Sequence, residues 1–296
     1  MYLKTSSQKA PCENTFRAIT NALQASKLCD VTGVFSVACG RHGCYAPQSL
    51  VDLFKGEQQK NADFSFLKGL KYTNVQYDQT VLLIYDIICQ YIIYIRQRIG
   101  HHLPPDLIID AAIGLFHIHA HKEQCFFQFA PTFIPGTGIV AGEILESLWS
   151  SLNSISPMAR TATLAHRSEI LDDHATDSNH KKAIGMVSSL CRSYLHATDM
   201  LEHAKTYYQK LTEEAGDIAV AMWTDDILKA ENGRRKDVSV MNIYAAKMPD
   251  NHQMPSSRPP NAQSDSWMEL SLGVEEKQCV KISIIFNFIL EFLFIS

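Results

Sequence analysis

The sequence predicts an α/β protein, with a core of strands and interspersed helices followed by an all-α extension. Three observations predict this. The run "TVLLIYDII" at 80–88 is almost entirely apolar, as is typical of a strand buried on both faces of a sheet. The stretch "VTGVFSVACGRHGCYAP" at 31–47 alternates β-branched and small residues around glycines, which predicts two short strands and a turn. From 156 to 235 the apolar residues recur at helical spacing.

Other elements of the core follow in chain order. Residues 12–29 carry apolar side chains at helical spacing, and 61–72 predict a short helix. The apolar run leads into a helical segment at 89–100. Residues 106–121 fit either a strand or a helix, and they end in a cluster of histidines.

A glycine-containing loop at 131–142 precedes a helix predicted over 143–155. These elements divide the chain into five segments. They are an N-terminal helical segment, the core, a helical extension, a polar linker and an apolar tail, at 1–30, 31–155, 156–235, 236–279 and 280–296. The tail is shorter than the ~20 residues that cross a bilayer. We interpret it as a non-native terminus rather than a membrane anchor, so a membrane is not an expected partner.

Length and composition are those of an ordinary globular protein. The chain has 296 residues, enough for one large domain or two small ones. Its hydrophobic fraction of 46% and charged fraction of 20% argue against disorder. The formal net charge is −4, whereas nucleic-acid-binding domains usually carry a basic excess. Any contact with DNA is therefore expected to be local or to need a further part of the protein.

Cysteine usage points to a reducing compartment. The eight cysteines show no regular spacing and no CxxC pair, which argues against a disulfide framework and against a zinc ribbon. The first residues lack the apolar segment of a secretory signal. We therefore expect an intracellular protein, nuclear or cytoplasmic, that is not secreted. Phosphate-binding loops and dinucleotide fingerprints are also missing, so no small-molecule cofactor is expected.

Asp86 closes the apolar run and lies within "LLIYDIICQY" at 82–91. A buried carboxylate without a partner is costly, so this aspartate needs one. Open α/β sheets place functional groups at the carboxyl ends of their strands, which favours a functional role. The alternative is that Asp86 caps the helix that follows, a role that aspartate fills well.

Glu143 and Glu146 begin the predicted helix after the glycine-containing loop. They are three residues apart, so both lie near one face of the first turns. One interpretation is that they complement the positive end of the helix dipole. The other is that one of them meets Asp86 at a divalent cation, because Mg²⁺ prefers oxygen ligands and two-metal hydrolysis uses clustered carboxylates.

The segment "FHIHAHKEQC" at 116–125 holds His117, His121 and Cys125 at intervals of four residues. On one continuous helix these three side chains would share a face. The pattern resembles half of a zinc site that lacks an evident fourth ligand. A structural, hydrogen-bonded cluster is the alternative.

Six stretches taken together resemble transposases of the Kyakuja–Dileera–Zisupton (KDZ) superfamily, which are abundant in mushroom-forming fungi. They are "DVTGVFSVACGRHG" (30–43), "DLFKGEQQKNADFSF" (52–66), "LLIYDIICQY" (82–91), "GLFHIHAHKEQC" (114–125), "FIPGTGIVAGEILESLWSSLN" (133–153) and "AHRSEILDDHATDSNHKK" (165–182). Each stretch is weak evidence alone, whereas six in the same order are specific.

The resemblance implies an RNase H-like fold of the DDE type, in which a mixed sheet and a later helix present two aspartates and a glutamate to Mg²⁺ or Mn²⁺. By position, Asp86 matches the second aspartate, as a catalytic residue and metal ligand. Glu143 and Glu146 both match the region of the glutamate, and the residues alone do not separate them. The family also has a histidine/cysteine block, which is matched by His117, His121 and Cys125. The resemblance implies a structural role near the site for these three residues.

The first aspartate of the family lies upstream of the matching stretches, and Asp30 does not fill its position. The resemblance therefore implies an N-terminally truncated transposase, with 31–155 as a partial RNase H-like catalytic core. Such a remnant of an enzyme for metal-dependent DNA strand cleavage and transfer is expected to be inactive. DNA and full-length transposase are the implied partners. The alternative function is a non-catalytic DNA- or protein-interaction module derived from a transposase.

Overall fold

The computed structural model describes residues 12, 30–54, 56–73, 75, 80–138 and 140–245. The chain divides into two compact units, and each is described by itself. The first consists of Met1–Pro131 and Ile139–Tyr194, and the second of Thr132–Gly138 and Leu195–Ser296. Apart from Cys12, the helix predicted at 12–29 lies outside the described residues, as do the apolar tail and most of the polar linker.

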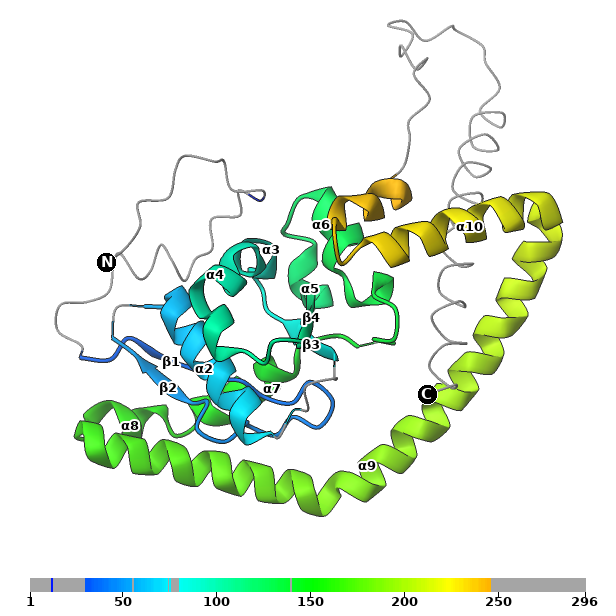
Figure 1. Cartoon of the computed structure of the whole chain (residues 1–296). Coiled ribbons are helices and arrows are strands. Elements are labelled where there is room, and N and C mark those ends of the chain that lie inside the picture. Colours follow the sequence, from blue (N-terminus) through cyan, green and yellow to red (C-terminus); the bar gives the residue numbers. More distant parts are fainter. Residues whose placement is uncertain are drawn as a thin grey trace, which may run out of the picture. The chain divides into compact units, whose positions relative to one another are not determined.

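The strands of the first unit form two separate sheets (Figure 1). β1 (Gly33–Phe35) pairs antiparallel with β2 (Val51–Leu53). β3 (Thr80–Ile84) pairs parallel with β4 (Ile108–Ala112), with Thr80 opposite Ile108 and Ile84 opposite Ala112. The prediction of a mixed α/β protein is confirmed, although helices dominate and the described strands do not join into one mixed sheet.

The burial predicted for the apolar run at 80–88 is wrong. β3 covers its first five residues, and their side chains are half-buried or exposed. A strand is buried on both faces when helices cover both faces of a wide sheet, whereas β3 has one partner strand among the described residues. The other sheet adjoins its end, because the rings of Phe35 and Tyr85 meet edge to face with centroids 5.9 Å apart.

The two strands predicted within 31–47 are only partly present. β1 is the first of them, and the second is reduced to an isolated bridge between Ala38 and Tyr45. The bridge encloses the predicted turn, in which the N–H of Gly43 donates to the carbonyl of Cys39 over 2.8 Å. Gly43 has a φ of +67°, a backbone conformation that glycine adopts without strain.

Helix α2 (Gln59–Tyr72) lies along the β1–β2 sheet (Figure 1). Its Asp63 accepts a hydrogen bond from the Tyr91 hydroxyl over 2.6 Å and forms an ion pair with Arg98 over 2.9 Å. These contacts tie α2 to the short helices that connect β3 with β4. They are α3 (Ile88–Tyr91), η1 (Ile92–Tyr94), α4 (Ile95–Ile99) and η2 (Gly100–His102). The segment predicted at 89–100 is therefore helical but broken.

Four further helices of this unit follow β4. They are α5 (Leu115–Ile118), α6 (Glu123–Phe129), α7 (Ile144–Asn153) and α8 (Ser156–Thr161). Among the most deeply buried side chains are those of Ile88 in α3, Ile113 just after β4 and Ile118 in α5. The core thus lies under the same segments that carry the predicted site residues.

Helix α9 (Leu164–Ala215) begins in the first unit and continues into the second. Asn179 fixes its first half to the turn before β2, because its side chain accepts from the Tyr45 N–H over 2.7 Å and donates to the Tyr45 carbonyl over 3.0 Å. Arg167 adds an ion pair with Asp52 of β2, with 3.0 Å between the nearest atoms. These long-range polar contacts hold the helix against the sheet.

The second unit contains α10 (Asp217–Gly233) and η4 (Val238–Tyr244), while η3 (Pro131–Phe133) lies at its boundary with the first. The helical spacing over 156–235 thus corresponds to α8, α9 and α10. η4 falls in the stretch predicted as the beginning of the polar linker, and it is ordered because Met241 and Tyr244 are buried. In the part of the chain that the structure describes, no helix has both the length and the apolar character needed to cross a membrane.

Candidate metal centres

Three carboxylates lie around the imidazole of His117. Its Nε2 atom is 3.8 Å from Oδ2 of Asp86, 3.5 Å from Oε2 of Glu143 and 3.5 Å from Oε1 of Glu146. The ligand atoms of His117, Glu143 and Glu146 all lie within 4.8 Å of one another, close enough to share one metal ion. The structure therefore brings together the three carboxylates that the sequence singled out. We call these three carboxylates, together with His117, the carboxylate cluster.

Parallel pairing delivers two members of the carboxylate cluster to the same edge of a sheet. The Tyr85 N–H donates to the Ala112 carbonyl over 3.0 Å, which extends the ladder to the residue before Asp86. Asp86 therefore follows the carboxyl end of β3, and His117 follows the carboxyl end of β4. The alternative role of Asp86 as a helix cap is excluded, because Ile87 is the N-cap residue of α3 and no side chain caps that helix.

Two glycines allow the loop before α7 to approach the start of α5. A Cβ atom on Gly114 would lie 2.9 Å from Cδ of Glu143 and would overlap its carboxylate. Gly142 has a φ of +80°, and a Cβ there would lie 3.0 Å from the Gly114 Cα. In the space that remains, the Phe116 N–H donates to Oε1 of Glu143 over 2.9 Å. Glu143 is thus held by the backbone, at the residue just before α7.

The electrostatics of the carboxylate cluster favour a positive ion. Burial raises the pKa of Asp86, the His117 imidazole lowers it, and the carboxylates of Glu143 and Glu146 raise it again. The net pKa is raised, so the negative charge of Asp86 is unfavourable in the cluster as it stands. A bound cation would relieve that cost. Glu146 is the most open member, with 62% of its side chain exposed against 22% for Glu143.

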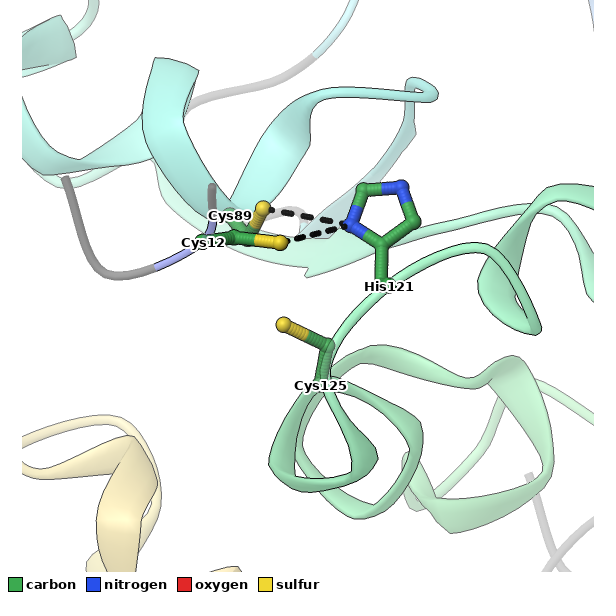
Figure 2. Close-up of side chains that lie close together, drawn as sticks. All are labelled: Cys12, Cys89, His121 and Cys125. Atoms are coloured by element: carbon green, nitrogen blue, oxygen red, sulfur yellow. Dashed lines mark hydrogen bonds between the residues drawn. The ribbon is translucent and has the colours of Figure 1, made fainter. Parts of the chain in front are cut away.

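A second cluster holds the other two residues of the histidine/cysteine block. The prediction that His117, His121 and Cys125 share one helical face is wrong, because α5 ends at Ile118 and α6 begins at Glu123. The break separates His117 from the other two. His121 and Cys125 instead meet Cys12 and Cys89, and we call these four residues the thiol cluster (Figure 2).

The thiol cluster is compact and buried. His121 Nδ1 lies 3.5 Å from Sγ of Cys12 and 3.6 Å from Sγ of Cys89, and all four ligand atoms lie within 4.8 Å of one another. The relative exposures of Cys12, Cys89 and Cys125 are 1%, 3% and 5%. Figure 2 shows the three sulfurs and the ring gathered in one place.

Sequence reasoning missed two members of the thiol cluster. Cys12 is separated from His121 by 109 positions and Cys89 by 32, so no local spacing relates them. One signal was available for Cys89, which follows Asp86 by three residues and so had to lie near the same strand end. For Cys12 the sequence offers no comparable signal.

Two members of the thiol cluster, Cys125 and His121, favour the protonation states that metals bind. Hydrogen bonding from the Cys89 thiol lowers the pKa of Cys125 to about 7, with a further lowering by Cys12, although burial opposes both. The donor role of Cys89 and its burial raise the pKa of that thiol. Burial lowers the pKa of His121 and so favours its neutral form. Thiolate and neutral imidazole are the ligand forms of these side chains.

A separate cavity of about 410 Å³ lies beside β1, α7 and the beginning of α9. Its lining includes Trp149, Arg160 and Arg167, and no member of either cluster belongs to it. The two clusters are therefore not parts of this cavity.

The chain matches the model of the KDZ family, described as the Kyakuja-Dileera-Zisupton transposase, over residues 2–179. The chain belongs to this family. Neither the curated proteins nor the solved structures compared with the chain match it. Membership of the KDZ family confirms the predicted relationship, makes the chain a transposase-derived protein and implies DNA as a partner. The matched residues include every member of both clusters.

Proposed function

We propose that this chain is a remnant of a DDE-type transposase with a partial RNase H-like core, whose carboxylate cluster binds Mg²⁺ or Mn²⁺. We further propose that it binds DNA without completing strand cleavage. The observation that carries the proposal is the convergence of Asp86, Glu143 and Glu146 on one ring nitrogen, at 3.5–3.8 Å. They converge at the carboxyl ends of parallel strands, where α/β folds place functional groups.

The donor set fits a hard divalent cation. Carboxylate oxygens are the ligands that Mg²⁺ prefers. Those of Glu143 and Glu146 lie within 4.8 Å of each other and of His117, and the Asp86 carboxylate lies 3.8 Å from the same imidazole. When bound there, Mg²⁺ supplies positive charge to phosphodiester oxygens that become more negative during cleavage. We assign Glu143 as the fixed ligand, because the Phe116 N–H holds it and little of it is exposed. Glu146, which is largely exposed, is the carboxylate that can turn toward a bound DNA strand.

Two features support a defective site. The DDE arrangement that the family resemblance implies uses two aspartates, and Asp86 is the single aspartate among the described partners of His117. The β1–β2 and β3–β4 sheets adjoin at Phe35 and Tyr85 but share no strand among the described residues. A strand that joined them would complete a mixed sheet, which fits the proposal of a partial core.

Cation binding and nicking test the proposal separately. We would titrate the chain with Mn²⁺, follow free Mn²⁺ by electron paramagnetic resonance, and incubate labelled duplex DNA with Mg²⁺ or Mn²⁺. Asp86→Asn and Glu143→Gln should each weaken Mn²⁺ binding. Asp173→Asn is the matched control, because Asp173 is exposed on α9 and outside the cluster. No variant, nor the unchanged chain, should nick the duplex.

Two results would contradict the proposal. Mn²⁺ affinity that is equal in Asp86→Asn, Glu143→Gln and Asp173→Asn would remove the cation site. Metal-dependent nicking by the unchanged chain, lost in Asp86→Asn, would confirm the site but show that it is active. DNA binding at low salt without any Mn²⁺ binding would favour the non-catalytic interaction module.

A further inference from the structure

We propose that Cys12, Cys89, His121 and Cys125 bind one structural Zn²⁺ ion, which holds the segments that carry the carboxylate cluster. This site is distinct from the proposed cation site and goes beyond it, because the two share no ligand. It would serve the fold rather than the chemistry on DNA.

The spacing of the ligand atoms is that of a tetrahedral zinc site. Zn–S bonds of ~2.3 Å and Zn–N bonds of ~2.0–2.1 Å place tetrahedral ligand atoms roughly 3.5–3.8 Å apart. His121 Nδ1 lies 3.5 Å and 3.6 Å from the sulfurs of Cys12 and Cys89. The remaining separations stay within 4.8 Å, so zinc would need little movement of the side chains.

The donor chemistry selects zinc over the cation of the carboxylate cluster. Three sulfurs and one imidazole nitrogen form a complete Cys₃His set, which is a closed structural zinc site. No carboxylate of the described residues belongs to this group, so it offers nothing to hard Mg²⁺. The three thiols are almost fully buried, which leaves no open position for a substrate or water.

The elements that meet at the thiol cluster are too short to be stable alone. α3 and α5 have four residues each, and α6 has seven. Helices this short do not form on their own in water, because nucleation costs more than so few hydrogen bonds return. Cys89 lies on α3, Cys125 on α6 and His121 in the turn between α5 and α6. A shared metal ion would join these pieces at fixed distances.

The thiol cluster also borders the carboxylate cluster through the backbone. The backbone of Asp86 lies close enough to the His121 ring to raise its pKa, against the larger lowering by burial. Nδ1 faces the thiols, which leaves Nε2 as the ring nitrogen available to the Asp86 backbone. Histidines that bind metals commonly donate their other N–H to a backbone carbonyl. A zinc ion on Nδ1 would therefore fix the position of Asp86.

Metal analysis of the full chain tests the proposal. The protein would be purified with Zn²⁺ in the medium and its zinc content measured by mass spectrometry. We expect one zinc per chain in the unchanged protein and in Cys191→Ser, whose cysteine is exposed on α9. Cys89→Ser and Cys125→Ser should lose the zinc. Asp86→Asn should keep it, so a failure of this proposal is distinguishable from a failure of the proposed function.

Co²⁺ substitution covers the case in which the serine variants do not fold. The unchanged chain should give the visible d–d bands of tetrahedral Co²⁺ and thiolate-to-Co²⁺ charge transfer. His121→Cys should keep the tetrahedral spectrum with stronger charge transfer, whereas His121→Ala should lose it. The proposal is overturned if the unchanged chain takes up neither metal, if two of the three thiols form a disulfide instead, or if Cys89→Ser retains as much zinc as Cys191→Ser.

Discussion

The carboxylate cluster and the thiol cluster each draw on the same two stretches of chain and differ in the properties that select a metal. Asp86 and Cys89 are three residues apart, and His117 and His121 are four apart, yet each pair is divided between the clusters. The first cluster offers oxygens, one of them on a side chain that is 62% exposed. The second offers three nearly inaccessible sulfurs.

This difference fits a structural role for the thiol cluster and a cation-binding role for the carboxylate cluster. A partly exposed, like-charged group of carboxylates costs stability until a cation arrives, and it can exchange that cation with solvent. A buried sulfur site with a full ligand set exchanges slowly and contributes stability. The two properties can be perturbed independently, since the clusters share no side chain.

The largest expected effect comes from removing a ligand of the thiol cluster. Cys125→Ser should lower the free energy of unfolding by at least about 3 kcal/mol. This is well below the zinc-binding free energy of ~10–16 kcal/mol in zinc-finger peptides, because here an apolar core also holds the helices. Urea unfolding followed by tryptophan fluorescence measures it, with Cys191→Ser as control. A strong chelator should destabilise the unchanged chain similarly and leave Cys125→Ser unaffected; equal stability with and without chelator would contradict this.

The carboxylate cluster should respond to a hard cation instead. Mn²⁺ at 100 times its dissociation constant should stabilise the unchanged chain by about 2.7 kcal/mol, because it binds the folded state alone. Asp86→Asn should abolish this gain, whereas Asp173→Asn should keep it. Thermal unfolding with and without Mn²⁺ gives the result, and an undiminished Mn²⁺ effect in Asp86→Asn would count against the site.

A pair of glycine variants tests the geometry of the carboxylate cluster separately from the stability of the fold. Gly114 has a φ of −57°, which alanine tolerates, so Gly114→Ala acts through overlap with the carboxylate of Glu143. The carboxylate should move and Mn²⁺ affinity should fall about tenfold, as when supporting contacts of a metal ligand are lost. Gly185→Ala on α9 meets open space and should stabilise the helix by up to ~1 kcal/mol. Unchanged Mn²⁺ affinity in Gly114→Ala would contradict the geometry.

The smallest effect concerns Glu57, which accepts a hydrogen bond from the Tyr85 hydroxyl beside Asp86. Burial raises the pKa of Glu57, the Tyr85 hydrogen bond lowers it, and Asp86 raises it, with a net increase from 4.5. Stability from this group is therefore complete below pH 4.5 and is lost as pH rises through the raised pKa. Glu57→Gln keeps an acceptor without the charge, so its stability relative to the unchanged chain should increase with pH. The same difference in free energy of unfolding between Glu57→Gln and the unchanged chain at pH 4 and at pH 7 would refute this.

The sequence predicted the carboxylate cluster better than the thiol cluster for a physical reason. Asp86 is marked by the end of a strand, and Glu143 and Glu146 by the start of a helix, so local pattern and family resemblance both indicate them. Cys12 has no pattern of its own, and Cys89 is marked only by its place three residues after Asp86, because their meeting with His121 depends on the packing of separate elements.

The wrong predictions about the fold have the same origin. The helical face proposed for His117, His121 and Cys125 fails because Lys122 adopts an extended backbone conformation, with φ −63° and ψ 149°, and separates α5 from α6. The full burial expected of β3 fails because burial depends on neighbouring strands, which an apolar run does not specify. Local spacing indicated the elements, whereas their partners had to come from tertiary structure.

The separation of Cys12 from His121 gives the thiol cluster a topological role. The two residues are 109 positions apart, so a metal that binds both closes a loop of that length. A permanent crosslink over about 100 residues restricts the unfolded chain by about 4–5 kcal/mol in the chain-entropy account. A protease that cut the backbone once between these residues would leave both fragments joined through the ion, so the metallated chain would keep its core after a single nick.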